Sequence, residues 1–415
     1  MNLSVTHLWA YFGEFTERPL AWEIRALIQL GVDLRILSFR PARAVAPDDA
    51  DLAERVTYLD PVRGPGGGSV AKACALLAPS TLKRPWTLCW GHNLVAHPGI
   101  QGLAGWFRAS TRRAALAREL RAARPSVLHA QHGHVGWWAA PVARRFGLPL
   151  VVSVRGADLL LLERLAFERW RELVEWPTVL LTRSDEMSDH LQRMGAPRDR
   201  VVTHRSGIPV RDIPFRERRP VEPQRPVIIL SVGRLIPKKG MEDTISALAA
   251  SEQMRMRAVL RIVGEGPSRE HLEDMARQLG ISRRVKFLGR LTHAETLGEM
   301  AKADLFCLAS RSVESSDREG IPNVLKEASA SGLPIISTTH AGIPEAVENG
   351  ETGLLVQEGN VEQLVAAMDQ MLDMDRDWAD MGRKGRALIE EKFDVDRLTR
   401  RLVERYEALV KEAGA

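Results

Sequence analysis

Two glutamates frame the start of a predicted helix in the second half of this chain of 415 residues. Pro322 suits the first helical turn, because its missing N–H would be unpaired there anyway, so Glu319 lies in the loop just ahead. Glu327 lies about five residues further in, roughly 7.5 Å along the axis at about 1.5 Å per residue. The free N–H groups and the positive dipole end of a helix N-terminus suit an anion such as a diphosphate. One carboxylate could then bind the hydroxyls of a sugar and the other those of a ribose, or both could be ordinary helix-end acids.

A second group of candidate residues follows the apolar run 227–232, which predicts a buried strand. The turn after this strand contains Gly233, Arg234, Lys238 and Lys239, and a predicted helix comes next. Glycine lets a ligand approach the backbone closely and the cations neutralise charge, so such a turn is a physical anion site. A basic surface loop would have the same composition.

Two further turns of this half stand at predicted strand ends. Residues 264–267, which include Gly266, follow the apolar run 258–263, and Arg290 follows the run 285–288. The first turn could press its backbone on a nucleotide, or it could be a tight turn without ligand contact.

In the first half, apolar runs at 5–11 and 32–39 predict strands on either side of a helix at 19–30. This order predicts a parallel sheet with right-handed crossovers, in which ligands bind beyond the carboxyl ends of the strands. The turn at Gly13 is therefore a candidate wall of a ligand site, or a turn with no ligand contact.

Histidines gather where the predicted strand 126–130 ends, at His129, His132 and His134. Three histidines at this spacing raise the question of a metal. Because no carboxylate or cysteine accompanies them in the sequence, metal binding is the less favoured interpretation.

The next predicted strand, 150–154, leads to Arg155 and Asp158. An arginine is a fixed cation that could hold a phosphate but cannot exchange a proton near neutral pH. Asp158 is expected to orient Arg155 by a bidentate pair or to cap the following helix.

The length of the chain is too great for one core and predicts two domains. Five prolines between Pro209 and Pro226 mark a linker, so we expect a first domain at 1–210 and a second at 211–395. Asp394 and Asp396 precede the last predicted helix, where an N-cap is a more plausible role than metal binding.

Other features of the composition bear on location and partners. Three scattered cysteines suit a reducing cytosol, and neither a start signal nor a run of about eighteen apolar residues is evident, so we expect a cytoplasmic protein. The stretch 86–124 is rich in Trp and Arg. Its tryptophans are expected in the core and its arginines on a solvated helix face, and the alternative is contact with anionic lipid. No motif typical of nucleic-acid binding accompanies the charge.

The spacing Glu319, seven residues, Glu327 resembles the signature of glycosyltransferase family 4, whose members are retaining enzymes of the GT-B fold. Residues 337–347 and 349–356 also look like that family, and the loop 310–320 is similar to its exopolysaccharide and colanic-acid branch. The resemblance implies two Rossmann-like, doubly wound parallel-sheet (α/β) domains facing a cleft. It also implies that a C-terminal helix at 396–415 packs back on the first domain.

The resemblance assigns roles residue by residue. Glu319, Arg234 and Lys239 would be catalytic, and the implied donor-binding residues are Gly233, Gly266, Arg290, Gly320, Ile321, Asn323 and Glu327. On the acceptor or sugar side it implies Gly13, His132, Arg155 and Asp158, although the family usually has histidine where this chain has Arg155.

The implied reaction moves a sugar from a nucleotide-diphosphate sugar, with retention, to a lipid-linked saccharide in exopolysaccharide or cell-surface polysaccharide synthesis. No cofactor and no metal is expected, and the protein would be peripheral on the inner face of the plasma membrane. The alternatives are a non-catalytic nucleotide-sugar-binding assembly subunit and a GT-B epimerase or phosphorylase. A Rossmann dehydrogenase is disfavoured because Gly-x-Gly-x-x-Gly does not follow the first strand.

Overall fold

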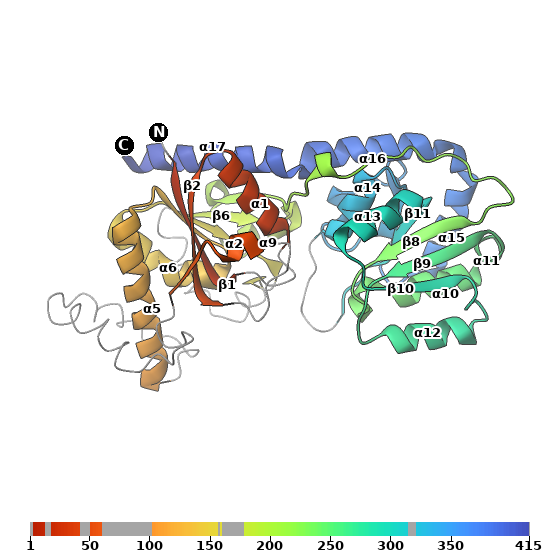
Figure 1. The fold of residues 1–415 in the computed structure, drawn as a ribbon, viewed down its shortest axis with the longest axis horizontal. Coiled ribbons are helices and arrows are strands. Elements are labelled where there is room, and N and C mark those ends of the chain that lie inside the picture. The colour runs from red at the N-terminus through yellow and green to blue at the C-terminus, as the bar shows by residue number, and fades with distance from the viewer. Residues whose placement is uncertain are drawn as a thin grey trace. The chain divides into compact units, whose positions relative to one another are not determined.

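The computed structural model describes residues 3–12, 18–41, 50–59, 102–156, 158–159, 178–313 and 321–414. The predictions made for Gly13, Glu319, Gly320 and the segment 60–101 therefore lie outside the described residues. The chain forms two compact units (Figure 1). The first unit comprises Met1–Thr182, Met187–His204 and Thr399–Ala415, and the second comprises Arg183–Glu186 and Arg205–Leu398.

The first unit is built on a sheet of seven strands in the order β3-β2-β1-β4-β5-β6-β7, all paired in parallel. Its strands are β1 (Ser4–Phe12), β2 (Asp33–Pro41), β3 (Val56–Tyr58), β4 (Val127–Ala130), β5 (Leu150–Ser153), β6 (Thr178–Thr182) and β7 (Val201–Thr203). The order reverses between β1 and β4, where Val5 pairs with Val127. In open α/β sheets such a reversal marks the place where ligands bind.

Helices cover both faces of this sheet (Figure 1). They are α1 (Arg18–Gln29), α2 (Ala50–Ala53), α5 (Gly102–Ala123), α6 (Gly133–Phe146), α9 (Asp185–Arg193) and the C-terminal α17 (Val395–Gly414). One core joins the strands to α5 and α6 and contains Leu8, Leu116 and Val135. The other joins the opposite face to α17 through Leu402 and Leu409. Every residue of the central strands β4, β5 and β6 is buried, which explains the continuous apolar runs of the sequence there.

A buried polar network also fixes α17 to the first unit. The Tyr406 hydroxyl lies 2.6 Å from His129 Nδ1 and 3.4 Å from His7 Nε2, and His129 Nε2 lies 2.9 Å from Ser153 Oγ. Burial lowers the pKa of His7 to about 4, because the charged imidazole would lose its hydration. The network therefore pairs polar groups that would be costly to bury alone.

The second unit repeats the architecture with six parallel strands in the order β10-β9-β8-β11-β12-β13. The strands are β8 (Val227–Val232), β9 (Ala258–Val263), β10 (Val285–Gly289), β11 (Leu305–Leu308), β12 (Ile335–Thr338) and β13 (Gly353–Val356). The helices are α10 (Met241–Ala250), α11 (Glu252–Arg257), α12 (Arg269–Gln278), α13 (His293–Lys302), α14 (Asn323–Ala330), α15 (Val361–Asp373) and α16 (Trp378–Phe393). Two parallel sheets with interleaved helices confirm the predicted α/β fold class.

The helix ends follow the local signals of the sequence. Thr292 and Glu295 form a capping box at the start of α13, and Asn360 caps α15 by accepting a bond from the Gln363 N–H. Asp394 Oδ1 accepts a hydrogen bond of 2.9 Å from the Arg397 N–H at the start of α17. Asp394 is thus an N-cap.

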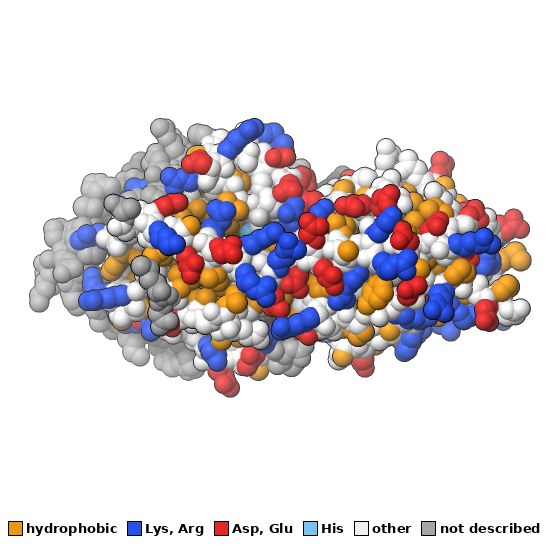
Figure 2. Space-filling model, turned by 90° about the horizontal axis from the view of Figure 1, so that it is seen from above, with side chains coloured by type: hydrophobic (Ala, Val, Ile, Leu, Met, Phe, Trp, Pro, Cys, Tyr) orange, Lys and Arg blue, Asp and Glu red, His pale blue; other side chains and the backbone are white. Residues whose placement is uncertain are grey.

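Acidic and basic side chains are interspersed on the face displayed in Figure 2. The exposed side of α16 has several ion pairs, among them Arg386–Glu390 at 2.6 Å and Lys384–Asp380 at 3.0 Å. Exposed pairs of this kind contribute about 0–1 kcal/mol each. These ion pairs lie on a solvated surface that carries charges of both signs.

Candidate functional site

The turns after β8 and β9 interlock through their backbones in the second unit. The Gly233 N–H donates to Val263 O at 3.0 Å, and the Leu235 N–H donates to Glu265 O at 3.0 Å. A Cβ on Gly264 would collide with Gly233 O, and one on Gly266 would collide with Leu235 O. Glycine is therefore required here because the two turns approach each other more closely than a side chain permits.

Lys239 is buried at the end of the first of these turns, with its side chain against Gly233. A Cβ added to Gly233 would lie 3.4 Å from Lys239 Cδ, an ordinary contact distance, so the lysine stem packs along this turn. Arg234, on the same turn, is exposed. Gly240 follows with φ +62° against the Ala309 carbonyl, a left-handed conformation that favours glycine. The structure thus brings the predicted glycine, arginine and lysine together beyond the carboxyl end of β8.

The same turn contacts the segment that follows β11. The Arg311 N–H donates to Lys238 O at 3.0 Å, and the Arg311 guanidinium binds Asp243 at 2.9 Å and Glu242 at 2.5 Å on α10. Arg311 therefore anchors the start of the loop that leads towards α14 beside the basic turn.

Glu327 lies in the middle of α14, which begins one residue later than predicted because Pro322 takes the N-cap position with φ −60°. The side chain is only 5% exposed, and its Oε1 lies 3.2 Å from His293 Nε2. His293 is the first residue of α13, just beyond the turn that contains Arg290. A buried carboxylate is thus held beside the turn after β10.

His293 was missed in the sequence, although its place at a helix start directly after a candidate turn was a usable signal. Ile321 is partly buried and packs close to Gly342. Asn323 has its Oδ1 buried without a hydrogen-bond partner among the described residues. A buried amide oxygen of this kind is costly unless a ligand or water satisfies it.

Lys326, next to Glu327, is a second functional candidate that the sequence did not reveal. It is 1% exposed, and its Nζ donates to Ser206 O at 2.6 Å while lying 5.4 Å from the Phe393 ring centroid. Burial lowers the pKa of Lys326 to about 7, and the charge of Glu327 opposes that shift while Arg183 reinforces it. A lysine at this position is an internal cation that holds the segment around Ser206.

In the first unit, Asp158 gathers the predicted residues at the ends of β4 and β5. Its Oδ2 accepts the Arg155 N–H at 3.0 Å, its Oδ1 lies 3.3 Å from His134 Nδ1, and His132 Nδ1 lies 3.8 Å away. The expectation that no carboxylate accompanies the histidines is therefore wrong, because residues 24 apart meet in space. The expected roles of Asp158 are also incomplete, since it orients two histidines and the backbone of Arg155.

The charge of Asp158 is stabilised by these partners. Burial by itself disfavours the carboxylate, but the bond from His134, the charge of His132 and the Gly133 N–H together hold the pKa of Asp158 below its usual range. The ligand atoms of the two histidines and Asp158 all lie within 4.8 Å of one another. Two imidazoles and a carboxylate are donors that Zn²⁺ accepts, and the same atoms satisfy one another by hydrogen bonding without an ion.

Each half of the chain matches a known protein family. The family description "Glycosyltransferase Family 4" matches residues 23–212, and "Glycosyl transferases group 1" matches residues 212–388. A GDP-mannose-dependent alpha-(1-6)-phosphatidylinositol monomannoside mannosyltransferase of Mycobacterium tuberculosis is 32% identical over 75% of this chain and 77% of its own length. The chain belongs to glycosyltransferase family 4.

Other relatives of this family 4 glycosyltransferase agree with that assignment. The putative colanic acid biosynthesis glycosyltransferase WcaL of Escherichia coli is 32% identical over 58% of the chain, a match that spans 59% of the WcaL length. Among solved structures, Anabaena HepE in complex with UDP has a TM-score of 0.72 at 17% identity, covering 98% of this chain and 100% of that one. The lipopolysaccharide outer core galactosyltransferase WaaB has a TM-score of 0.69 at 16% identity, with full coverage of both chains. These structures show that the fold is shared.

The family 4 glycosyltransferase thus presents two separate groups of predicted residues. In the second unit, one cluster holds Gly233, Arg234, Lys239 and Gly266. Ile321 precedes α14, Asn323 begins it and Glu327 lies in its middle. In the first unit, His132, Arg155 and Asp158 lie together. Among the described residues, no helix has the length and hydropathy that crossing a membrane requires.

Proposed function

We propose that this family 4 glycosyltransferase is a retaining, metal-independent enzyme that transfers a sugar from a nucleotide-diphosphate sugar to a saccharide acceptor. The observation that carries the proposal is the pair of buried charges in the second unit. Lys239 lies on the glycine turn after β8, and Glu327 lies on α14. A cation on a glycine-containing strand-to-helix turn and a buried carboxylate in the same unit suit a nucleotide-diphosphate, which supplies both an anion and hydroxyl groups.

In the proposed donor complex, the interlocked glycine turns let the diphosphate approach the backbone. Arg234 and Lys239 neutralise its charge, and Gly233 and Gly266 are assigned to backbone contact with the donor. Glu327 binds the ribose hydroxyls, with His293 orienting its carboxylate. Arg290 stands at the turn that would meet the base, and Asn323 offers its buried amide oxygen to the sugar or phosphate.

The proposed chemistry is a front-face substitution at the anomeric carbon. The bond from that carbon to the diphosphate oxygen breaks as a bond to the acceptor oxygen forms on the same face. The acceptor proton passes to the departing diphosphate. Arg234, Lys239 and the N-terminus of α14 stabilise the charge that develops on the leaving group. The family resemblance assigns Glu319 and Gly320 to the sugar.

On the acceptor side, the proposal assigns Gly13, His132, Arg155 and Asp158. Arg155 is a fixed cation where a proton-exchanging histidine would stand, and its guanidinium lies 5.7 Å from the Trp9 ring centroid. It therefore serves charge binding in place of proton transfer. Asp158 holds the backbone of Arg155 and both histidines in position.

We propose that the acceptor is a lipid-linked saccharide and that the enzyme works at the cytoplasmic face of the plasma membrane. The relatives named for colanic acid, amylovoran and phosphatidylinositol mannoside synthesis support an acceptor of this class. Flotation with anionic liposomes tests the membrane contact. Absence of salt-sensitive binding, with full activity on a water-soluble acceptor, would contradict this part of the proposal.

A panel of nucleotide-sugars tests the donor assignment. A donor that binds the folded chain raises its Tm by linkage, and the nucleotide-sugar that does so should also be turned over. The anomeric configuration of the product, determined by NMR, should match that of the donor. Donor binding with neither hydrolysis nor transfer would favour a non-catalytic binding subunit, and an inverted product would contradict retention.

A further inference from the structure

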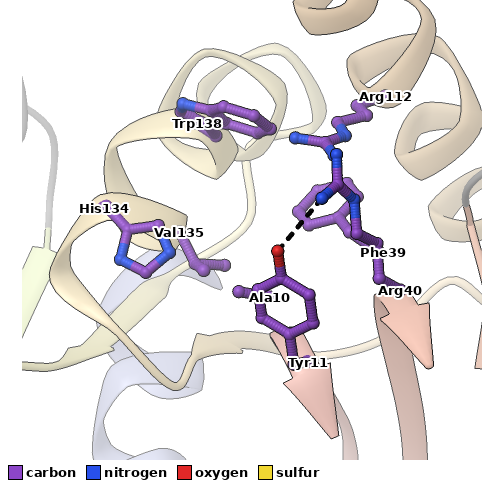
Figure 3. A pocket seen from close by; sticks show the side chains of 8 residues that line it. All are labelled: Ala10, Tyr11, Phe39, Arg40, Arg112, His134, Val135 and Trp138. Carbon is purple, nitrogen blue, oxygen red and sulfur yellow. Dashed lines mark hydrogen bonds between the residues drawn. The ribbon is translucent and has the colours of Figure 1, made fainter. Parts of the chain in front are cut away.

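A pocket at the carboxyl ends of β1 and β2 in the first unit contains two arginines (Figure 3). It has a volume of about 150 Å³. The lining residues come from β1, β2, α5 and α6 and are Ala10, Tyr11, Phe39, Arg40, Arg112, His134, Val135 and Trp138. The volume lies below the roughly 300 Å³ at which pockets for whole small ligands begin, so the pocket fits one chemical group of a larger ligand.

Arg112 is held in the pocket by two aromatic rings. Its guanidinium carbon lies 4.6 Å from the Trp138 ring centroid and 5.3 Å from that of Phe39, and Phe39 is itself buried. A cation over the face of Trp or Phe is attracted by the ring, and the planar guanidinium can in addition stack on the ring, which an ammonium group cannot do. The arrangement therefore fixes the direction of the cation before any ligand binds.

Arg40 supplies the second cation. One of its terminal nitrogens donates to the Tyr11 hydroxyl at 3.1 Å, and its guanidinium carbon lies 5.9 Å from the Tyr11 ring centroid. In Figure 3 the guanidinium groups of Arg40 and Arg112 lie near one another at the same side of the pocket. Two guanidinium groups at one side of the pocket offer several N–H donors that one anion can accept together.

The other lining groups favour an anion as well. None of the eight lining residues is acidic. Asp158, which contacts His134 Nδ1 at 3.3 Å, is not among the lining residues. His134 is in the first turn of α6, whose positive dipole end favours negative charge. Planar guanidinium groups match the oxygens of a phosphate in pairs.

We propose that this pocket binds the phosphate or diphosphate group of the acceptor, with Arg40 and Arg112 as its ligands. The assignment of the group to the acceptor rests on the proposed transferase function, while the anion site rests on the pocket alone. A diphosphate joins a saccharide to its lipid, so the pocket would position the sugar hydroxyl that accepts the transferred unit. Tyr11 and Trp138 offer ring faces to that first sugar.

The anion site is tested by titration with inorganic pyrophosphate at low salt. The full chain is used with Arg234→Ala and Lys239→Ala, which remove the proposed donor clamp. One binding site should remain, and Arg40→Gln or Arg112→Gln should weaken it at least tenfold. Arg112→Lys should bind pyrophosphate more tightly than Arg112→Gln but more weakly than its parent, since lysine keeps the charge and lacks the planar guanidinium.

The matched control is Arg113→Gln, the neighbouring arginine of α5, which lies 5.9 Å from the Trp137 ring centroid and does not line the pocket. This variant should bind pyrophosphate like its parent, and circular dichroism should show all variants folded. The proposal is overturned if no pyrophosphate site remains after the clamp is removed, or if both pocket variants bind normally.

Two further measurements identify the group and its source. A sugar 1-phosphate should bind more tightly than glucuronate. If glucuronate binds more tightly, the pocket recognises the carboxylate of a sugar and not a phosphate. In transfer assays Arg112→Gln should raise the KM of a phosphate-bearing acceptor at least tenfold with little change in donor KM. If the unmodified chain turns over none of the nucleotide-sugars, the proposed function fails, while the pyrophosphate titration still decides the pocket.

Discussion

Glu327→Gln gives the sharpest test of the donor site. The carboxylate is almost fully buried and contacts His293 at 3.2 Å, and in the proposed complex it also accepts hydrogen bonds from the ribose. Hydrogen bonds to a charged group contribute about 1.5–3 kcal/mol each. At about 1.4 kcal/mol per tenfold, loss of one such bond weakens nucleotide binding roughly 10- to 150-fold.

The effect of Glu327→Gln should appear in KM for the donor and in the Kd of the nucleotide product, with a smaller effect on kcat. Binding that is equal in the ground state and the transition state changes KM alone. Glu319→Gln should differ, because the catalytic role proposed for Glu319 predicts a loss of kcat. A hundredfold decrease corresponds to about 2.7 kcal/mol at 1.36 kcal/mol per tenfold.

Isothermal titration with the nucleotide product and steady-state kinetics separate these outcomes. Glu299→Gln is the matched control, because Glu299 is another buried carboxylate of this unit, paired with Arg261 at 2.7 Å and Lys302 at 2.9 Å. It should lower Tm without changing nucleotide affinity. Unchanged nucleotide affinity in Glu327→Gln would refute the donor assignment, and near-normal turnover in Glu319→Gln would refute its catalytic role.

Three further outcomes are expected. Activity should persist in EDTA, and complete loss restored by a divalent metal would contradict the metal-independent mechanism and point to the cluster around Asp158. Burial lowers the pKa of Lys326 in the folded chain to about 7. Between pH 7 and about 10, Lys326 is therefore deprotonated in the folded chain and protonated in the unfolded chain. The free energy of unfolding should therefore rise with pH by up to about 1.4 kcal/mol per unit relative to Lys326→Met, and denaturant titrations showing parallel pH profiles would contradict this. Tyr406→Phe removes a buried hydroxyl 2.6 Å from His129 and should cost about 1–3 kcal/mol of stability, whereas Tyr11→Phe, at an exposed side chain, should leave Tm nearly unchanged.

The fold was predictable because local signals agree with it. The bounds of β8 and β9 and the start of α10 coincide with the apolar runs and the glycine turns that delimit them. Each parallel sheet follows from the repeated order of strand, turn and helix along the chain, because the connections between parallel strands are right-handed. The helix start at α14 differed by one residue, because Pro322 fits the N-cap as well as the first turn.

The contacts that complete the candidate site could not be predicted in the same way. His293 and Glu327 are 34 residues apart in the sequence, and Lys326 and Ser206 are 120 apart. Spacing within one element says nothing about such pairs, since they depend on which helices the sheet order brings together. The basic helix α5 is another element whose contacts could not be predicted from its sequence. Its composition predicted a solvated face or a lipid contact, whereas Arg112 stacks between two rings of the first unit.

The two units apply one architecture to different recognition problems. In the second unit, glycines let the turns after β8 and β9 pack backbone against backbone, and the proposed diphosphate site there has Arg234 and Lys239 as its cations. In the first unit, large side chains line the space beyond β1 and β2, and the arginines among them are held by aromatic rings. A backbone cradle suits a diphosphate whose attached nucleoside is read elsewhere, because it recognises the phosphate geometry alone. A side-chain pocket can differ among relatives that share the donor turns, so substitutions there can change the acceptor without altering the donor site.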